Sequence, residues 1–281
     1  MGQASNAVDY KLADGLRYRY EVENCVKEMA GQDVKGKLKT AGVDKVASIK
    51  VKEKDSGNKI AVLYAEGEIR DDDSSSPFSA DEQVISEEMA NKLRKLKDDD
   101  DVKAVVFRVN SPGGSAYISE QIWKEVVELK AKKPIVVSMG NYAASGGYYI
   151  SCAANKIVAE RTTLTGSIGV FGVVRNFTGT FDKVGVTTDI VKTNTFADLG
   201  DISRPMREDE KALIQRGVEQ TYDLFLTRCA DGRGMTKAEI DSIGQGRVWT
   251  GEQALERGLV DQLGGMDDAI KEAATLAELT D

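Results

Sequence analysis

The chain has 281 residues, a net formal charge of -8 and a pI near 5.0, and it contains no histidine. Its acidic balance argues against a nucleic-acid partner, because phosphate binding needs a basic stripe that the sequence does not show. A chain of this length can bury the core of one large α/β domain or two small ones, so its size permits an enzyme, and proteins or peptides are the expected partners.

Several composition signals exclude further classes of protein. The three cysteines have no paired spacing, so neither a disulfide framework nor a zinc site is predicted; they are Cys25, Cys152 and Cys229. The acidic runs Asp71–Ser79 and Asp98–Asp101 are typical of solvated loops rather than metal sites, and we expect no metal and no cofactor. No apolar run approaches the roughly 18 residues of a membrane-spanning helix, and the first residues lack a signal-peptide pattern, so the chain as written is expected to be soluble.

From Lys59 onward, short β-branched runs alternate with longer amphipathic stretches, which is typical of repeated βαβ units. The predicted strands are Ile60–Ile69, Val102–Val109, Pro134–Met139 and a segment around Thr188–Val191. The predicted helices are Asp81–Lys97, Ile118–Lys130, one that begins near Ser145, one within Glu208–Cys229, and the carboxyl end; the apolar segment Lys156–Glu160 and the turn Thr165–Gly169 lie between them. The pattern predicts an α/β fold.

The two ends of the chain resemble each other. Ala254–Leu263 reads ALERGLVDQL and Ala7–Leu16 reads AVDYKLADGL, with Ala, Leu, Asp and Leu at matching offsets, and an acidic amphipathic helix follows each. Chance similarity between short Leu- and Ala-rich helices is the alternative. If the repeat is real, residues 1–31 are the helical tail of a preceding copy, 32–58 are a linker rich in Lys, Gly and Asp, and 59–281 are the domain that follows.

Ser145 lies in the stretch YAASGGYYIS, at the junction between a predicted strand and a predicted helix. A serine hydroxyl is a weak nucleophile at neutral pH, so acyl-transfer enzymes supply a base and hydrogen-bond donors for the developing oxyanion. Without histidine the usual triad cannot be built. The remaining option for the base is a lysine whose pKa is lowered by burial, so that its amine is neutral.

Candidate oxyanion donors lie in two glycine-rich breaks. The segment Ser111–Gly114 reads SPGG and follows a buried strand, and Gly146 follows the serine at a helix start. Taken singly, each break is explained by a tight turn or by close helix packing. However, both follow consecutive strands, which places them at the carboxyl edge of one sheet, where α/β proteins build their sites.

At these residues the sequence resembles a known family. The blocks VVFRVNSPGGS, VVSMGNYAASGGYYISCAANKIVA and TLTGSIGVFG are similar, in order, to the motifs of the signal peptide peptidase A family, also called protease IV or peptidase family S49. The resemblance runs from about Ile60 to Leu276. It implies a Clp protease/crotonase-like fold with stacked βαβ units and a serine–lysine dyad.

The resemblance also implies roles for individual residues. Ser145 matches the nucleophile, Gly113 and Gly114 match the oxyanion-hole loop, and Gly146 is the neighbouring donor. Ser167 in TGSIG matches the serine that orients the lysine, although a satisfied turn serine would be an equal interpretation without the family.

The lysine itself is missing where the family's single-domain members carry it, because the matching position here is Ala197. Lys192 lies a few residues too early, which in an extended segment misplaces the amine by more than a hydrogen bond allows. Lys156 and Lys183 are most simply surface residues. In the double-length form of the family, the amino-terminal half supplies the lysine, so the chain resembles the carboxyl-terminal half of that form.

The resemblance implies a serine endopeptidase that degrades cleaved signal peptides and other apolar peptides, inactive or weakly active without its other half. It further implies a homo-oligomer, such as a tetramer, held on the extracytoplasmic side of the bacterial cytoplasmic (inner) membrane by a segment absent from this sequence. Two rival functions remain open: a non-catalytic peptide-binding assembly subunit, and a crotonase-like acyl-CoA enzyme that shares the fold and the oxyanion logic but needs no nucleophilic serine.

Overall fold

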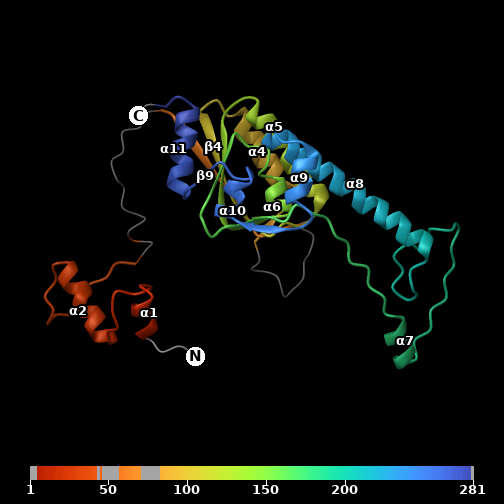
Figure 1. The fold of residues 1–281 in the computed structure, drawn as a ribbon, viewed down its shortest axis with the longest axis horizontal. Helices are drawn as coiled ribbons and strands as arrows, with labels where there is room; N and C mark the ends of the chain where they lie inside the picture. Colours follow the sequence, from red (N-terminus) through yellow and green to blue (C-terminus); the bar gives the residue numbers. More distant parts are fainter. Residues whose placement is uncertain (1–4, 43–44, 46–56, 71–82, 280–281) are drawn as a thin grey trace. The chain divides into compact units, whose positions relative to one another are not determined.

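The computed structural model describes residues 5–42, 45, 57–70 and 83–279 (Figure 1). The chain divides into two compact units, Met1–Lys54 and Asp55–Asp281, which are described separately. The larger unit contains the sheet and all the residues predicted to carry chemistry. The segment Asp71–Ser79 and much of the predicted linker lie outside the described residues.

A mostly parallel sheet organises the larger unit. Five strands run parallel in the order β1–β4–β5–β6–β9; they are Lys59–Glu66, Val102–Ser111, Ile135–Ala144, Lys156–Ala159 and Gln262–Leu263. The carboxyl end of β5 pairs with β7 (Leu164–Gly166), and β8 (Val248–Thr250) pairs antiparallel to β7. A separate parallel pair joins β2 (Glu68–Ile69) to β3 (Val84–Ile85).

Helices cover both faces of this sheet (Figure 1). One face carries α4 (Glu88–Asp98) and α5 (Ala116–Lys130), and the other carries α11 (Met266–Leu276). The remaining helices of this unit are α6 (Gly146–Tyr149), α7 (Thr178–Val184), α8 (Glu208–Arg233), α9 (Lys237–Ile243) and α10 (Gly251–Glu256).

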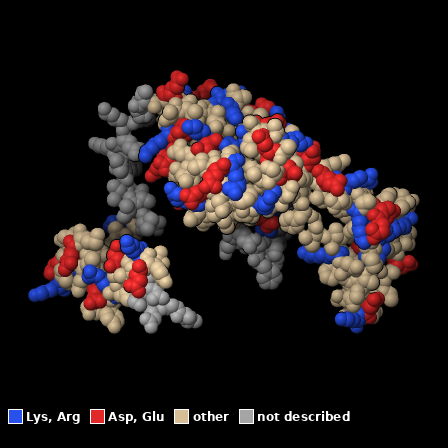
Figure 2. All heavy atoms as spheres, viewed as in Figure 1, with Lys and Arg blue, Asp and Glu red and all other residues tan. Residues whose placement is uncertain are grey.

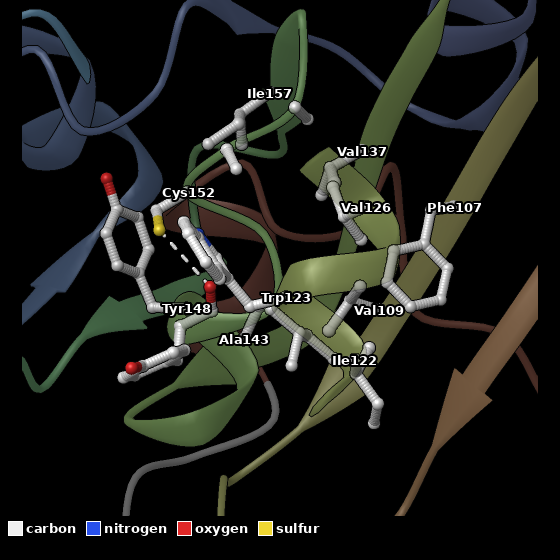
Figure 3. Packing of buried hydrophobic residues seen from close by; sticks show 14 of the residues in the cluster. Phe107, Val109, Ile122, Trp123, Val126, Val137, Ala143, Tyr148, Cys152 and Ile157 are labelled. Carbon is white, nitrogen blue, oxygen red and sulfur yellow. Dashed lines mark hydrogen bonds between the residues drawn. The ribbon is translucent and has the colours of Figure 1, made fainter. Parts of the chain in front are cut away.

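Alternating residues of the central strands build two apolar layers, because successive side chains of a strand point to opposite faces. Phe107 and Val109 of β4 pack with Ile122 and Val126 of α5 in the larger layer (Figure 3). Val106 of β4 points to the other face and packs in a smaller layer with Ala269 and Ala273 of α11. Burial on both faces explains why β4 and β5 have nearly continuous apolar sequences.

Three elements differ from the prediction by more than a small shift of their ends. The strand predicted as Ile60–Ile69 is interrupted at Gly67, whose φ of 100° suits glycine, so that β1 and β2 belong to different sheets. The helix predicted to begin at Asp81 begins at Glu88, because Val84 and Ile85 form β3. Among the described residues, Thr188–Val191 has no regular secondary structure, so the strand predicted there is wrong.

The segment between β7 and α8, residues 170–207, leaves the sheet and carries α7; we call it the arm (Figure 1). Its β-branched residues have no sheet to join, and Val191 is 96% exposed. An ionic cluster joins the end of the arm to α8. Arg204 of the arm contacts both Asp198, at 2.8 Å, and Glu210 of α8, at 2.6 Å. Elsewhere, acidic and basic side chains are interspersed over the face shown in Figure 2.

This cluster predicts that the arm loosens in acid. The hydrogen bond from Arg204 lowers the pKa of Glu210 to about 2, and that from Lys192 lowers the pKa of Asp198 to about 2. A depressed carboxyl pKa stabilises the fold above the unfolded-state value, and this contribution is lost as the pH falls toward the folded-state value. We expect hydrogen exchange of the arm, normalised to intrinsic rates, to accelerate from about pH 4 downward, and Glu210→Gln to weaken this pH dependence. Unchanged exchange in the arm over that range would contradict the prediction.

The small unit repeats several backbone hydrogen bonds of the segment that contains α10 and α11. It contains α1 (Ser5–Asp9) and α2 (Arg19–Met29). Leu12 N–H donates to Ala7 O at 2.8 Å, and Leu259 N–H donates to Ala254 O at 2.9 Å. The left-handed residue that follows the first helix is Lys11 in one case, with φ 58°, and Gly258 in the other, with φ 72°.

The second helices of the two segments also match. A carboxylate accepts from the backbone N–H three residues earlier in both: Glu21 from Tyr18 at 2.7 Å, and Asp268 from Gly265 at 2.9 Å. Burial differs, since Leu259 is fully buried while its counterpart Leu12 is 81% exposed. The small unit thus has the backbone of a helix pair that elsewhere in this chain packs on a sheet.

Candidate active site

The two glycine-rich breaks meet at the carboxyl edge of the sheet. Ser111 ends β4 and Ala144 ends the neighbouring β5, so both breaks leave adjacent strands. A Cβ added at Gly113 would lie 2.6 Å from the N atom of Gly146 and 2.8 Å from the Cβ of Ser145. The backbone of the first break therefore lies directly against the serine and the residue after it.

Ser145 has an unusual backbone. Its φ of 53° and ψ of -119° are rare for a residue with a side chain, and such conformations are maintained only where the surrounding structure imposes them. The N–H of Ser145 donates to Gly166 O at 3.0 Å, and its carbonyl accepts from Tyr149 N–H at 2.9 Å. The side-chain Oγ has no hydrogen-bond partner among the described residues.

The three predicted donors are not equivalent. The N–H of Gly113 donates to Ser111 Oγ at 3.1 Å, so that donor is engaged within the loop. In the described part of the chain, the N–H groups of Gly114 and Gly146 have no acceptor. The loop is held open by β2, because Ile69 N–H donates to Gly113 O at 2.8 Å and Ile69 O accepts from the residue that follows Gly114. Two free amides beside a serine hydroxyl can stabilise an oxyanion.

Ser167 lies in the turn after β7 and also has a left-handed backbone, with φ 48°. Its N–H donates to Arg247 O at 2.7 Å, and the next residue, Ile168, accepts from Gly246 N–H at 2.8 Å. The turn is thus held by the turn segment 244–247, which leads into β8.

A cleft of about 870 Å³ is lined by Ser145, Gly113, Gly114 and Ser167, so the structure brings these four predicted site residues together. Gly146 lines a smaller cavity that also includes Ser145. The charged residues that line the cleft are the carboxylates Glu68 and Glu219; over the described residues, no lysine or arginine lines it.

The lysines considered from the sequence lie elsewhere. Lys192 forms an ion pair with Asp198 in the arm at 3.0 Å, and Lys156 forms one with Glu272 at 2.5 Å. Lys183 belongs to α7 in the arm. Ala197 is exposed in the same arm. The base of a dyad is therefore not supplied by any of these side chains in this arrangement.

The smaller cavity, of about 160 Å³, opens beside the serine. Its walls include Ala116 of α5, Val170 of the arm, and the rings of Tyr149 and Phe225, whose centroids are 4.6 Å apart. Mostly apolar walls beside the serine hydroxyl suit an apolar group of a ligand.

Sequence reasoning missed the residues that hold the site from a distance. Ser111 accepts from Gly113, as described above. Tyr222 of α8 accepts from Gln245 N–H at 3.0 Å and donates to Asp241 at 2.7 Å, which fixes the turn segment that holds the Ser167 turn. The serine of SPGG was visible in the motif, whereas no local pattern marks a tyrosine in the middle of an amphipathic helix.

The family can now be assigned from sequence comparison. The model of peptidase family S49 matches residues 127–280, more than half of the chain, and includes Ser145 and Ser167. The chain belongs to peptidase family S49. Over its described residues, this S49 chain has no group of three or more acidic, Cys or His side chains that could hold a metal ion, and no helix long and apolar enough to cross a bilayer.

Two relatives of this S49 chain are named as a protease and a peptidase. It is 41% identical to Protease 4 of Salmonella typhi over 98% of its own length but only 44% of that protein. It is 38% identical to the putative signal peptide peptidase SppA of Enterococcus faecium, over 85% of this chain and 70% of that protein. The chain therefore spans less than half of the Salmonella relative and most of the Enterococcus one.

A second family model, Clp protease, matches residues 78–168, which include β4, β5 and both glycine breaks. Together with the mostly parallel sheet covered on both faces, this match confirms the predicted Clp protease/crotonase-like α/β fold of the S49 chain. One solved ClpP1 structure from Listeria monocytogenes covers 74% of the chain at 15% identity with a TM-score of 0.48.

Proposed function

We propose that this chain is the nucleophile-bearing half of a serine peptidase with a serine–lysine dyad, which degrades cleaved signal peptides and other apolar peptides. Ser145 attacks the peptide carbonyl, the amides of Gly114 and Gly146 hold the oxyanion, and a neutral lysine from another half accepts and returns the proton. Water then releases the acyl group from the serine.

The observation that carries this proposal is the meeting of Ser145 with the Gly113–Gly114 loop. The serine has a strained backbone, a free hydroxyl and two unpaired amides at its side. A serine that only packed in the interior would not need this combination. The two breaks come close together at Gly113, where an added Cβ would lie only 2.6 Å from Gly146 N. The missing side chain of Gly113 therefore permits this close approach.

The base is proposed to come from a preceding copy of the domain. The cleft beside Ser145 lacks a cation in the described residues, and Ser167 stands ready at its edge with a free side chain. The backbone match between α1–α2 and α10–α11 supports residues 1–31 as the tail of that copy, with 32–58 as linker and 59–281 as the S49 domain. The Salmonella relative is long enough to hold such a copy.

The full protein is further proposed to be a homo-oligomer, because the arm exposes apolar side chains. Val191 and Val184 are 96% and 66% exposed, respectively, and large exposed apolar surface marks contact sites. The proposed place of the full protein on the extracytoplasmic side of the bacterial inner membrane rests on the family resemblance. No cofactor is part of the proposed reaction.

A fluorophosphonate probe tests the proposal in the complete protein. An activated serine is phosphonylated, so we expect stoichiometric labelling that disappears in Ser145→Ala, while Ser151→Ala, which changes a fully buried serine bonded to Gly147 O, keeps the label if it folds. Absence of Ser145-dependent labelling would favour a non-catalytic peptide-binding subunit. A crotonase-like acyl-CoA enzyme needs no nucleophilic serine, so an acyl-CoA activity that survives Ser145→Ala would favour that function instead.

A further inference from the structure

The main chain that leaves the Ser167 turn is unpaired along one wall of the site. Ile168 O accepts from Gly246 N–H at 2.8 Å, and pairing resumes only at Phe177, whose N–H donates to Ile202 O at 2.8 Å. Between them, the N–H and C=O groups of residues 169–176 form no hydrogen bond to any described residue. These residues have no regular secondary structure and run from the sheet toward α7 (Figure 1).

Helix α8 lines the same space as this segment. The cleft that contains Ser145 is lined both by Phe171 of the arm and by Val218 and Gln215 of α8. A further cavity of about 440 Å³ is lined by the next part of the segment, Gly172 and Val174, and by Gln215 and Ile214. The shared Gln215 and the consecutive Phe171 and Gly172 join the two cavities into one groove, which we call the arm groove.

Unpaired main-chain donors and acceptors along a groove form a template for an extended peptide, which adds to them as a strand. The arm groove begins at Ser145, where the proposed peptide substrate reacts. The same peptide therefore continues into the groove as its occupant. A stretch of about eight residues spans at most roughly 27 Å when extended, which sets the length of peptide that the groove can read.

Building on the proposed function, we propose that residues 169–176 and α8 bind the distal part of the peptide substrate, on one side of the cleaved bond, by main-chain pairing. The site then favours long extended peptides over short ones of the same sequence at the cleavage point. Main-chain pairing also makes this distal preference depend on length more than on side-chain identity.

Val174 and Val173 provide a matched pair of variants for the test. Val174 lines the arm groove, whereas its neighbour Val173 does not line it and is 76% exposed. Neither side chain is buried, so tryptophan at either position leaves the core intact. Val174→Trp is expected to obstruct the groove and Val173→Trp to leave it open.

The experiment uses the complete protein and three peptides with one cleavage sequence: a short one with about three residues on each side, and two extended by about eight residues toward either end. We expect one extension to raise kcat/KM by about tenfold or more, the effect of a few net hydrogen bonds. Val174→Trp should remove this gain without changing the rate for the short peptide, and Val173→Trp should keep it. Binding of the long peptide to the Ser145→Ala protein, followed by fluorescence anisotropy, should show the same pattern.

Two results would overturn the inference while leaving the peptidase assignment in place. One is Ser145-dependent cleavage with no advantage for either extension. The other is an advantage that survives Val174→Trp; a changed oligomeric state of that variant in light scattering would then assign the groove to a second copy of the chain. If the unmodified protein showed no Ser145-dependent cleavage, that result would instead count against the proposed function. The anisotropy measurement would still decide whether the groove binds peptide.

Discussion

The isolated chain should hydrolyse peptides about a thousandfold more slowly than the same chain combined with a lysine-bearing preceding half. A positioned general base contributes about 10² to 10⁴ in rate, and the cleft of this chain has no such base among its described residues. The measurement is the initial rate on a fluorogenic apolar peptide, with the two halves produced together or as one polypeptide.

The controls for this expectation lie in the chain itself. Lys192→Ala should leave the combined activity unchanged, because its amine pairs with Asp198 in the arm. Ser145→Ala should abolish the combined activity. Robust turnover by the isolated chain, lost in Lys192→Ala, would show that the base lies within this sequence after all.

Gly113→Ala should lower kcat in the complete protein by about 10² to 10³, the loss seen when an oxyanion donor is removed. The added Cβ would approach Gly146 N to 2.6 Å and Ala144 O to 2.8 Å, and these are backbone atoms that cannot move aside independently. The φ of 102° is also unfavourable for alanine, so the loop must shift and take the free amide of Gly114 out of line.

The rate of fluorophosphonate labelling and the thermal midpoint separate the two consequences of this substitution. Labelling should slow with kcat, and the midpoint should fall. Gly217→Ala on α8 is the matched control, because nothing lies within 4 Å of the added Cβ and a helical alanine stabilises by about 0.5–1 kcal/mol relative to glycine. Unchanged activity and labelling in Gly113→Ala would mean that the two breaks do not form one oxyanion site.

The parts of the site that could be predicted are those coded by local sequence. Val102–Val109 and Pro134–Met139 read as buried strands because both faces of the sheet are covered, and the breaks that follow them necessarily share one edge. That reasoning placed Ser145 and Gly113 near each other without coordinates. The assignment of Gly114 and Gly146 as the free donors needed the structure, since only there does Ser111 engage Gly113.

The features that could not be predicted depend on contacts distant in sequence. Tyr222 bonds to Asp241 and Gln245 across two helices, and no periodic pattern reports such a contact. The strands β8 and β9 have only three and two residues, too few for alternation to appear. Thr188–Val191 shows the opposite case, because β-branched residues favour a strand only where a neighbouring strand is available to pair.

The backbone of Ser145 has one further consequence. A side chain in that region of φ and ψ costs about 1–3 kcal/mol, and glycine could follow the same path without the penalty. Selection for stability alone would therefore favour glycine at this position. Keeping the serine trades free energy of unfolding for the hydroxyl that the proposed reaction uses.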